Sequence, residues 1–341
     1  MINSIYRLTE PRVIEEVFEE VNLNDDDIIV RPTYLSICKA DQRYYQGNRD
    51  LNTLKEKLPM ALIHEAIGEV VKDYTNTYKP GDKVVLIPNT PVEVDDVIEE
   101  NYLKSSKFRS SGHDGFMSKY ISISKDRVIK LPECIDLNVA SFIELISVAY
   151  HGIKRFKTFS HNRKNTIGVW GDGNLGFINA LLLKVLFPDS KIIVFGKNLE
   201  KLSYFSFADE TYNINQIPED LTIDHGFECV GGFKAELAIN QIIDIINPQG
   251  TIALLGVSEN KVGVNTRMVL EKGLNLFGSS RSGKKDFEET IDLISKNEYI
   301  LSYLKIIVAN ELEINSISDI LDAFNTDFNS NFGKTILKWN M

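Results

Sequence analysis

A glycine-rich turn between an apolar run and an amphipathic segment constrains the fold of this chain most. Residues 166–170 are apolar and β-branched, residues 175–187 have helical periodicity, and Pro188 stops that segment. The turn between them matches G-x-G-x-x-G, and its backbone amides at a helix N-terminus suit a pyrophosphate. The residues expected to bind a dinucleotide are therefore Gly171, Gly173, Asn174, Leu175 and Gly176.

The same texture continues along the chain and predicts an α/β fold. Apolar runs at 191–195, 225–230, 251–255 and 274–277 are expected to be buried strands, with a helix at 234–246 between two of them. Strands that alternate with helices form a parallel sheet, because each helix carries the chain from the end of one strand back to the start of the next. We therefore predict a Rossmann-type doubly wound parallel sheet.

The N-terminal part has a different pattern. Short β-branched runs at 27–32, 66–71 and 83–88 are broken by turn residues and predict a smaller, irregular β domain. Residues 334–339 resemble one more strand with no helix after it, which is expected to return to that first domain. The predicted domains are residues 1–146 completed by 285–341, and residues 147–284.

The end of the second predicted Rossmann strand indicates the cofactor. An acidic residue about 20 positions after the glycine motif would select NAD by binding the ribose 2′-hydroxyl. Here that place has Gly196, Lys197 and Asn198, and Lys201 follows. The absence of a carboxylate and the presence of Lys197 and Lys201 favour the 2′-phosphate of NADP(H), although solvated lysines would look the same.

Charge and cysteine usage exclude several classes of function. A net charge of −10 over 341 residues disfavours nucleic acid and anionic membranes as partners. Neither a basic, apolar leader nor a long apolar span is present, so a cytoplasmic protein is expected. The three cysteines, Cys38, Cys134 and Cys229, are distant from one another, so reduced thiols are expected and one thiolate can bind a metal.

Four scattered residues are candidate zinc ligands. Cys38, His64, Glu65 and Glu144 offer the sulfur, nitrogen and oxygen donors that zinc accepts. Their spacing is weak evidence by itself, since ligands from distant segments form no compact motif.

At these positions the sequence resembles the zinc-dependent medium-chain dehydrogenase/reductase family. The similarity lies in the Cys-x-x-Asp from Cys38 to Asp41, the His64-Glu65-x-x-Gly segment, Glu144 and the Gly-Asp-Lys-Val turn at 81–84. It implies a GroES-like β domain joined to a Rossmann domain, and one catalytic zinc per chain. No structural zinc is expected because residues 89–112 contain no cysteine, and Ala40 replaces the family's usual Ser or Thr proton relay.

Longer runs at 38–45, 104–115 and 227–232 resemble the ribulose-5-phosphate reductases within that family. The resemblance implies NADPH-dependent reduction of D-ribulose 5-phosphate to D-ribitol 5-phosphate, which supplies CDP-ribitol for teichoic acid or capsule synthesis. It also implies a homo-oligomer and allows association with a cytidylyltransferase. A zinc polyol or alcohol dehydrogenase acting on an unphosphorylated substrate, and a metal-free NADPH-binding reductase or regulator, remain alternatives.

Roles for individual residues follow from this hypothesis. Cys38 and His64 would hold the catalytic zinc, and Asp41 would accept the second ring N–H of His64 and fix its tautomer. Either Glu65 or Glu144 would complete the ligand set. The substrate phosphate needs cations or hydroxyls near these motifs, and the expected residues are Lys39, Arg43, Arg109 and Ser110.

Overall fold

The structure is a computed structural model that describes residues 2–21 and 26–341. The chain divides into two compact units, Met1–Leu145 with Ser282–Met341, and Ile146–Arg281. These divisions fall beside the boundaries predicted from the sequence, at 146 and 284. Residues 1 and 22–25, which belong to the predicted first domain, lie outside the described part.

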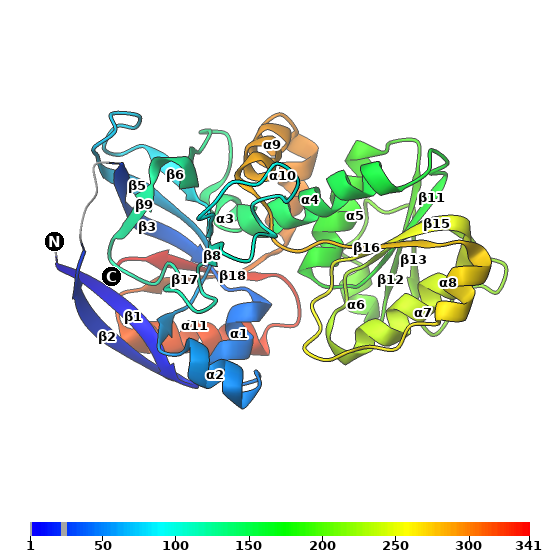
Figure 1. Cartoon of the computed structure of the whole chain (residues 1–341), viewed down its shortest axis with the longest axis horizontal. Coiled ribbons are helices and arrows are strands. Elements are labelled where there is room, and N and C mark those ends of the chain that lie inside the picture. The colour runs from blue at the N-terminus through cyan, green and yellow to red at the C-terminus, as the bar shows by residue number, and fades with distance from the viewer. Residues whose placement is uncertain (1, 22–25) are drawn as a thin grey trace. The chain divides into compact units, whose positions relative to one another are not determined.

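The first unit is built mainly from β-structure, as Figure 1 shows. A seven-stranded sheet has the order β10-β6-β5-β3-β18-β17, with β9 also paired to β3; a second sheet has the order β2-β1-β4, and β7 pairs with β8. The strands are β1 (Ile2–Glu10), β2 (Val13–Glu20), β3 (Asp27–Ser36), β4 (Met60–Ala61), β5 (Glu65–Asp73), β6 (Lys83–Leu86), β7 (Asn89–Thr90), β8 (Lys107–Phe108), β9 (Ile121–Ser124), β10 (Val128–Lys130), β17 (Val308–Ile314) and β18 (Lys334–Trp339).

Short helices complete this unit, and the last strand of the chain closes it. The helices are α1 (Lys39–Tyr45), α2 (Leu51–Lys57), the 3₁₀ turn η1 (Lys125–Arg127), α3 (Leu137–Ala140), α9 (Lys284–Ser295), α10 (Glu298–Ile306) and α11 (Ile317–Asn329). Strand β18 pairs antiparallel with β3, with Ile336 opposite Ser36. This pairing lies within the first unit, where the C-terminal strand was expected from the sequence.

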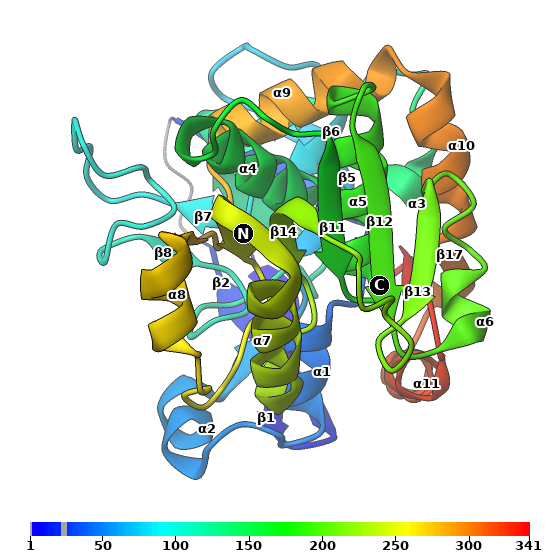
Figure 2. The same ribbon diagram turned by 90° about the vertical axis from the view of Figure 1, so that its right-hand side faces the viewer.

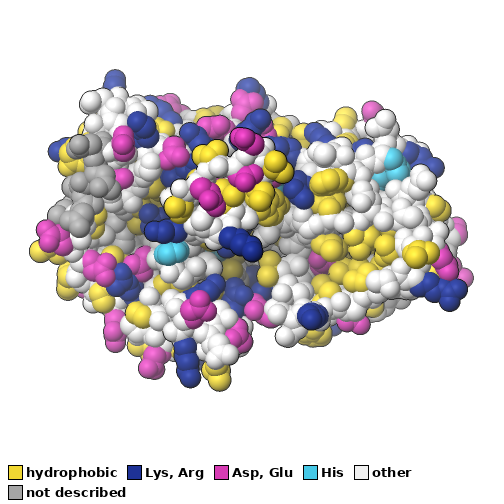
Figure 3. Space-filling model, viewed as in Figure 1, with side chains coloured by type: hydrophobic (Ala, Val, Ile, Leu, Met, Phe, Trp, Pro, Cys, Tyr) yellow, Lys and Arg dark blue, Asp and Glu magenta, His cyan; other side chains and the backbone are white. Residues whose placement is uncertain are grey.

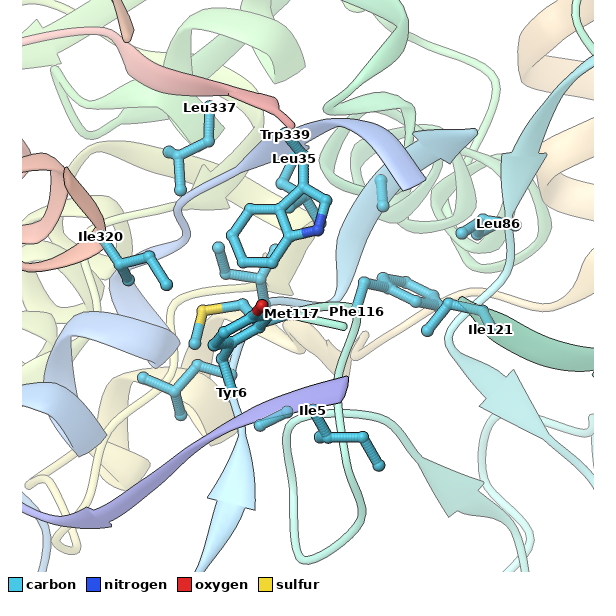
Figure 4. Close-up of a cluster of buried hydrophobic side chains, with 14 of the residues drawn as sticks. Ile5, Tyr6, Leu35, Leu86, Phe116, Met117, Ile121, Ile320, Leu337 and Trp339 are labelled. Carbon is cyan, nitrogen blue, oxygen red and sulfur yellow. The ribbon is translucent and has the colours of Figure 1, made fainter. Parts of the chain in front are cut away.

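An apolar core joins distant segments of this unit. Figure 4 shows Tyr6 of β1, Met117 and Trp339 of β18 gathered in one cluster. The rings of Tyr6 and Trp339 meet edge to face with centroids 5.5 Å apart, a favoured aromatic geometry. The indole N–H donates to the carbonyl of Ser118 at 2.9 Å, so its polar group is satisfied within the core. Burial of this set fixes the ends of the chain to its middle.

The second unit contains the predicted parallel sheet. Its six strands have the order β13-β12-β11-β14-β15-β16, and every neighbouring pair is parallel. This order reverses at β11, the first strand of the unit in sequence, which defines a doubly wound Rossmann sheet and confirms the predicted fold class. The strands are β11 (Thr166–Trp170), β12 (Lys191–Gly196), β13 (Glu210–Asn213), β14 (Ile223–Glu228), β15 (Ile246–Leu254) and β16 (Asn275–Gly278).

Helices cover the strands of this sheet because their apolar faces need burial. They are α5 (Asn174–Leu186), α6 (Leu199–Leu202), η2 (Gly232–Lys234), α7 (Ala235–Ile245) and α8 (Thr266–Lys272), while α4 (Ile143–Phe159) contains the division between the units. Figure 2 shows α7 and α8 beside one another and α6 beside β13. Helix α5 contacts β11 and β12, so the glycine turn that precedes it is held at the end of β11.

Acidic and basic side chains are interspersed on the face drawn in Figure 3, with hydrophobic side chains between them. Because charges of both signs are mixed, this face has no continuous positive potential that would attract a polyanion. Among the residues that the structure describes, no helix combines the length and the apolar character that a membrane crossing needs.

Candidate functional site

The first unit brings together three of the predicted zinc ligands. A donor atom from each of Cys38, His64 and Glu65 lies within 4.8 Å of the others. Cys38 follows β3 and is the N-cap of α1, whereas His64 directly precedes β5 and Glu65 begins it. Because β3 and β5 pair antiparallel, with Ser36 opposite Glu65, the end of one strand meets the start of the other. Sheet register therefore explains how ligands so far apart in sequence become neighbours.

Asp41 organises this cluster through its two carboxylate oxygens. Its Oδ1 accepts from the backbone N–H of Ile63 at 2.9 Å and from the hydroxyl of Ser110 at 2.7 Å, and its Oδ2 accepts from the N–H of Cys38 at 3.0 Å. The side chain is fully buried. Burial by itself would raise the pKa of Asp41, but the His64 charge and these hydrogen bonds lower it below the usual value.

The His64 ring faces Asp41 from inside the protein. Its Nδ1 lies 3.4 Å from Asp41 Oδ1 and makes no hydrogen bond of good geometry. Burial would lower the pKa of His64, but the neighbouring Asp41 and Cys38 raise it well above the usual value. With Nδ1 turned to the carboxylate, Nε2 is the nitrogen available to a metal.

The residue before His64 has an unusual backbone conformation. Ile63 has a φ of +70°, which is rare for a β-branched residue. Its N–H is held by Asp41, and its carbonyl accepts from Phe116 N–H at 2.7 Å. Strain of this kind concentrates at functional sites, and here it occurs at the residue directly before His64.

Lys334, which sequence reasoning missed, is buried beside the cluster. Its side chain is 2% exposed, and its ammonium donates to Glu65 Oε1 at 3.0 Å and to the carbonyl of Ile37 at 2.7 Å. Glu65 Oε2 is 2.8 Å from the same nitrogen but lacks hydrogen-bond geometry. The ammonium therefore compensates the charge of the buried carboxylate and lies close to both of its oxygens.

Glu144 lies close enough to the cluster for the charges of His64 and Glu65 to shift its pKa, but it is not one of the three residues whose donor atoms lie together. It is buried in the first turn of α4. Burial raises its pKa to about 7, against the lowering effect of the His64 charge. A role for Glu144 as a zinc ligand stays a prediction.

The donor set fits zinc. In a tetrahedral zinc site with bonds of about 2.0–2.3 Å, ligand atoms are on the order of 3.5 Å apart, which small side-chain adjustments of these three residues would reach. The half-buried thiol of Cys38 lies together with a buried imidazole and a buried carboxylate oxygen that makes no hydrogen bond. Three protein ligands that leave a position open are typical of catalytic rather than structural zinc.

The residues expected to meet a substrate phosphate differ in their surroundings. Lys39 is 70% exposed at its side chain and lies 3.8 Å from Asp327, and Arg43 is half-buried on α1. Ser110 is occupied with Asp41. The Arg109 guanidinium donates to the carbonyls of Asp114 and Ser122, both at 3.3 Å, and burial lowers its pKa to about 10. Of the four, Lys39 is the most accessible cation beside Cys38.

The second unit contains the glycine turn at the end of β11. Gly171 has a φ of +133°, and a Cβ there would lie 3.0 Å from the carbonyl of Cys229. A Cβ at Gly176 would come within 2.0 Å of the Gly171 carbonyl oxygen, so only glycine fits. The space at Gly173, the N-cap of α5, is open, because a Cβ there would meet nothing within 4 Å. This turn provides close backbone approach and a helix N-terminus for a pyrophosphate.

Lys197 and Lys201 lie after β12, where the sequence predicted them. Lys197 is exposed, and Lys201 is half-buried in the short helix α6. Neither position carries a carboxylate that would repel a 2′-phosphate. Their contact with a cofactor stays a prediction.

Comparisons with known proteins decide the family. The model of the alcohol dehydrogenase GroES-like domain matches residues 24–133, and the model of zinc-binding dehydrogenases matches residues 189–296. Ribulose-5-phosphate reductase 1 of Staphylococcus aureus is 56% identical over 341 residues, covering 100% of both chains. The chain belongs to the zinc-type medium-chain dehydrogenase/reductase family. A ribulose-5-phosphate reductase of Streptococcus pneumoniae is 47% identical and covers 99% of this chain and 98% of its own.

Solved structures agree with this family. The crystal structure of S. aureus TarJ in complex with NADPH superposes with a TM-score of 0.90 at 50% identity, covering 100% of both chains. An L-idonate 5-dehydrogenase of Escherichia coli, at 19% identity and a TM-score of 0.86, shares the fold. Family membership confirms the resemblance inferred from the motifs around Cys38, His64 and Glu144.

Proposed function

We propose that this protein reduces D-ribulose 5-phosphate to D-ribitol 5-phosphate with NADPH, with Zn²⁺ and NADP(H) as its cofactors. The observation that carries the proposal is the cluster of half-buried Cys38 with buried His64 and Glu65, in a chain 56% identical, over its full length, to a ribulose-5-phosphate reductase. The TarJ crystal structure with NADPH, at 50% identity, supports the cofactor.

The chain's own residues have separate tasks in this reaction. Cys38, His64 and Glu65 would hold zinc, which supplies a Lewis acid that polarises the ketone of the substrate. Asp41 fixes the direction of His64, and Lys334 holds Glu65 by an ion pair. Such preorganisation removes the need to rearrange charged groups when the carbonyl gains negative charge.

The glycine turn positions the other reactant. NADPH would supply the hydride, and the backbone at Gly171, Gly173 and Gly176 would bind its pyrophosphate at the start of α5. Asn174 and Leu175 open that helix and offer backbone N–H groups to the same anion.

The phosphate of the substrate needs cations close to the metal cluster. Lys39, whose side chain is 70% exposed, and Arg43 on the same helix would attract the phosphate. The proposal places the enzyme in the cytoplasm, as a homo-oligomer whose product goes to CDP-ribitol synthesis for teichoic acid or capsule, and allows a cytidylyltransferase as a partner.

Product identity tests the proposal directly. Incubation with ribulose 5-phosphate and NADPH is expected to give ribitol 5-phosphate, identified by carbon NMR, in an amount equal to the NADPH oxidised. Prior removal of zinc with a chelator is expected to abolish the product, and added Zn²⁺ to restore it. A product other than the pentitol phosphate, or undiminished turnover after complete zinc removal, would contradict the proposal.

The preference for NADPH over NADH can be tested through Lys197 and Lys201. Changing Lys197 and Lys201 together to alanine removes two cations expected at the 2′-phosphate, and charge-assisted contacts contribute about 1.5–3 kcal/mol each. Because two such contacts amount to about 3 kcal/mol or more, we expect KM for NADPH to rise by about a hundredfold or more, with little change for NADH, which lacks that phosphate. Steady-state kinetics with both cofactors would measure this. An equal rise for both would place the two lysines outside the 2′-phosphate site.

A further inference from the structure

We infer that Asp172, the second residue of the glycine motif, is a positioning residue for NADPH selection, because its carboxylate holds the turn that carries Lys197. The inference rests on the proposed use of NADPH and assigns its specificity to a residue outside the lysines themselves. Asp172 Oδ2 accepts from the backbone N–H of Lys197 at 2.7 Å and from that of Asn198 at 2.8 Å.

The contact is built into the ends of two neighbouring strands. Strands β11 and β12 are parallel, with Trp170 opposite Phe195, so the residues that follow them leave the sheet side by side. Gly196 has no side chain where Asp172 packs. A Cβ at Gly196 would lie 2.7 Å from the Asp172 Cβ and 3.0 Å from its Oδ2. The glycine at 196 is what allows the carboxylate to reach the turn.

Other bonds define the remainder of this turn. The Asn213 side chain donates to the carbonyl of Lys197 at 3.0 Å, and the Asn198 side chain accepts from the N–H of Lys201 at 3.2 Å. The backbone around Lys197 is thus held from the glycine turn, from β13 and from α6. The exposed side chain of Lys197 therefore starts from a backbone that is held in place.

The turn at Lys197 lies where Rossmann folds distinguish NADPH from NADH. In Rossmann folds the adenosine ribose lies between the glycine turn and the end of the second strand, and its 2′ substituent is read there. Asp172 bridges these two segments. Its carboxylate also occupies the two N–H groups that would otherwise attract an anion, so a 2′-phosphate has to be bound by side-chain cations.

The negative charge of Asp172 also repels a 2′-phosphate. This repulsion lowers the affinity for NADPH, whereas the positioning of Lys197 raises it. Repulsion by a partly exposed charge is screened by water and changes affinity by about fivefold or less. Misplacing Lys197 removes a contact that only the phosphorylated cofactor makes. We therefore expect the loss of position to dominate in a variant that lacks the side chain.

Binding of NADPH and NADH to the full chain, followed by fluorescence titration, tests this role. Asp172→Ala is expected to raise Kd for NADPH at least about tenfold and Kd for NADH less than about threefold. Asp172→Asn keeps an oxygen acceptor for both N–H groups and is expected to bind NADPH at least as tightly as the unmodified protein. Asp189→Ala, at an exposed position after α5, is the matched control and should change neither.

A second variant approaches the contact from the other side. Gly196→Ala would bring a Cβ within 2.7 Å of the Asp172 Cβ and 2.8 Å of Leu202 Cδ2, so it displaces the Asp172 side chain or the neighbouring Leu202, and it is expected to reproduce the selective loss of NADPH affinity. Equal weakening of both cofactors in Asp172→Ala, or no weakening in either, would overturn the inference. Equal affinity of the unmodified protein for NADPH and NADH would overturn the proposed cofactor preference itself, and that result would be read before any variant is compared.

Discussion

Replacing Cys38 with serine is expected to remove zinc from the protein and to lower kcat/KM by about a thousandfold or more. Cys38 contributes the only thiol of the donor cluster with His64 and Glu65. A serine hydroxyl stays protonated near neutral pH and is a poor zinc ligand in place of a thiolate. Lewis-acid stabilisation of the developing charge contributes several kcal/mol, and each 1.36 kcal/mol corresponds to about tenfold in rate.

Zinc content by elemental analysis and steady-state kinetics measure the two parts of this prediction. Cys134→Ser is the matched control, because Cys134 is an exposed cysteine of the same unit and lies outside the cluster. It should retain zinc and full activity. A Cys38→Ser protein that keeps one zinc per chain and normal kinetics would show that the metal is held elsewhere.

Replacing Lys334 with methionine is expected to destabilise the first unit by about 3–5 kcal/mol. The ammonium and the Glu65 carboxylate are both almost completely buried, with 2% and 0% of their side chains exposed. Removing the cation leaves a buried carboxylate without compensation and frees the Ile37 carbonyl from its donor. Urea unfolding monitored by tryptophan fluorescence would measure the loss, since Trp339 lies in the core of this unit.

The control for this variant lies on the same strand. Lys338 pairs with Glu311 near the surface, with about a third of each side chain exposed. Lys338→Met should therefore cost less than about 1 kcal/mol. The double variant of Lys334 and Glu65 to methionine should recover stability relative to Lys334→Met while losing zinc affinity. A Lys334→Met protein as stable as the Lys338→Met control would contradict the ion-pair interpretation.

Most of the Rossmann unit could be predicted from the sequence, because its signals are local, but the edge strand β13 and the short helices α6 and α8 were missed. Apolar runs, helical periodicity and the glycine spacing from Gly171 to Gly176 each occupy a single stretch of chain. The predicted helix at 175–187 is α5 (Asn174–Leu186), and Pro188 follows it as expected. Strand β15 begins at Ile246, earlier than the predicted 251, because Ile246 pairs with Ile223 across a register shift that no local pattern shows.

The metal site could be predicted only through family resemblance, because its geometry depends on strand pairing. Cys38 and His64 become neighbours through the register of β3 with β5. Lys334 had no signal, since a lysine at the start of a strand is usually exposed and its burial follows from the pairing of β18 with β3. Ser110 was expected near the substrate but donates to Asp41, a contact that depends on the fold of the loop after β8.

The most direct test of the account is the rate of NADPH oxidation with ribulose 5-phosphate, compared with free ribulose under identical conditions. A phosphate bound by two charge-assisted contacts should raise kcat/KM for the phosphorylated sugar by at least about a hundredfold. We expect that preference, and we expect zinc removal to abolish turnover of both sugars. Equal rates with free ribulose would contradict it and identify a general polyol dehydrogenase instead.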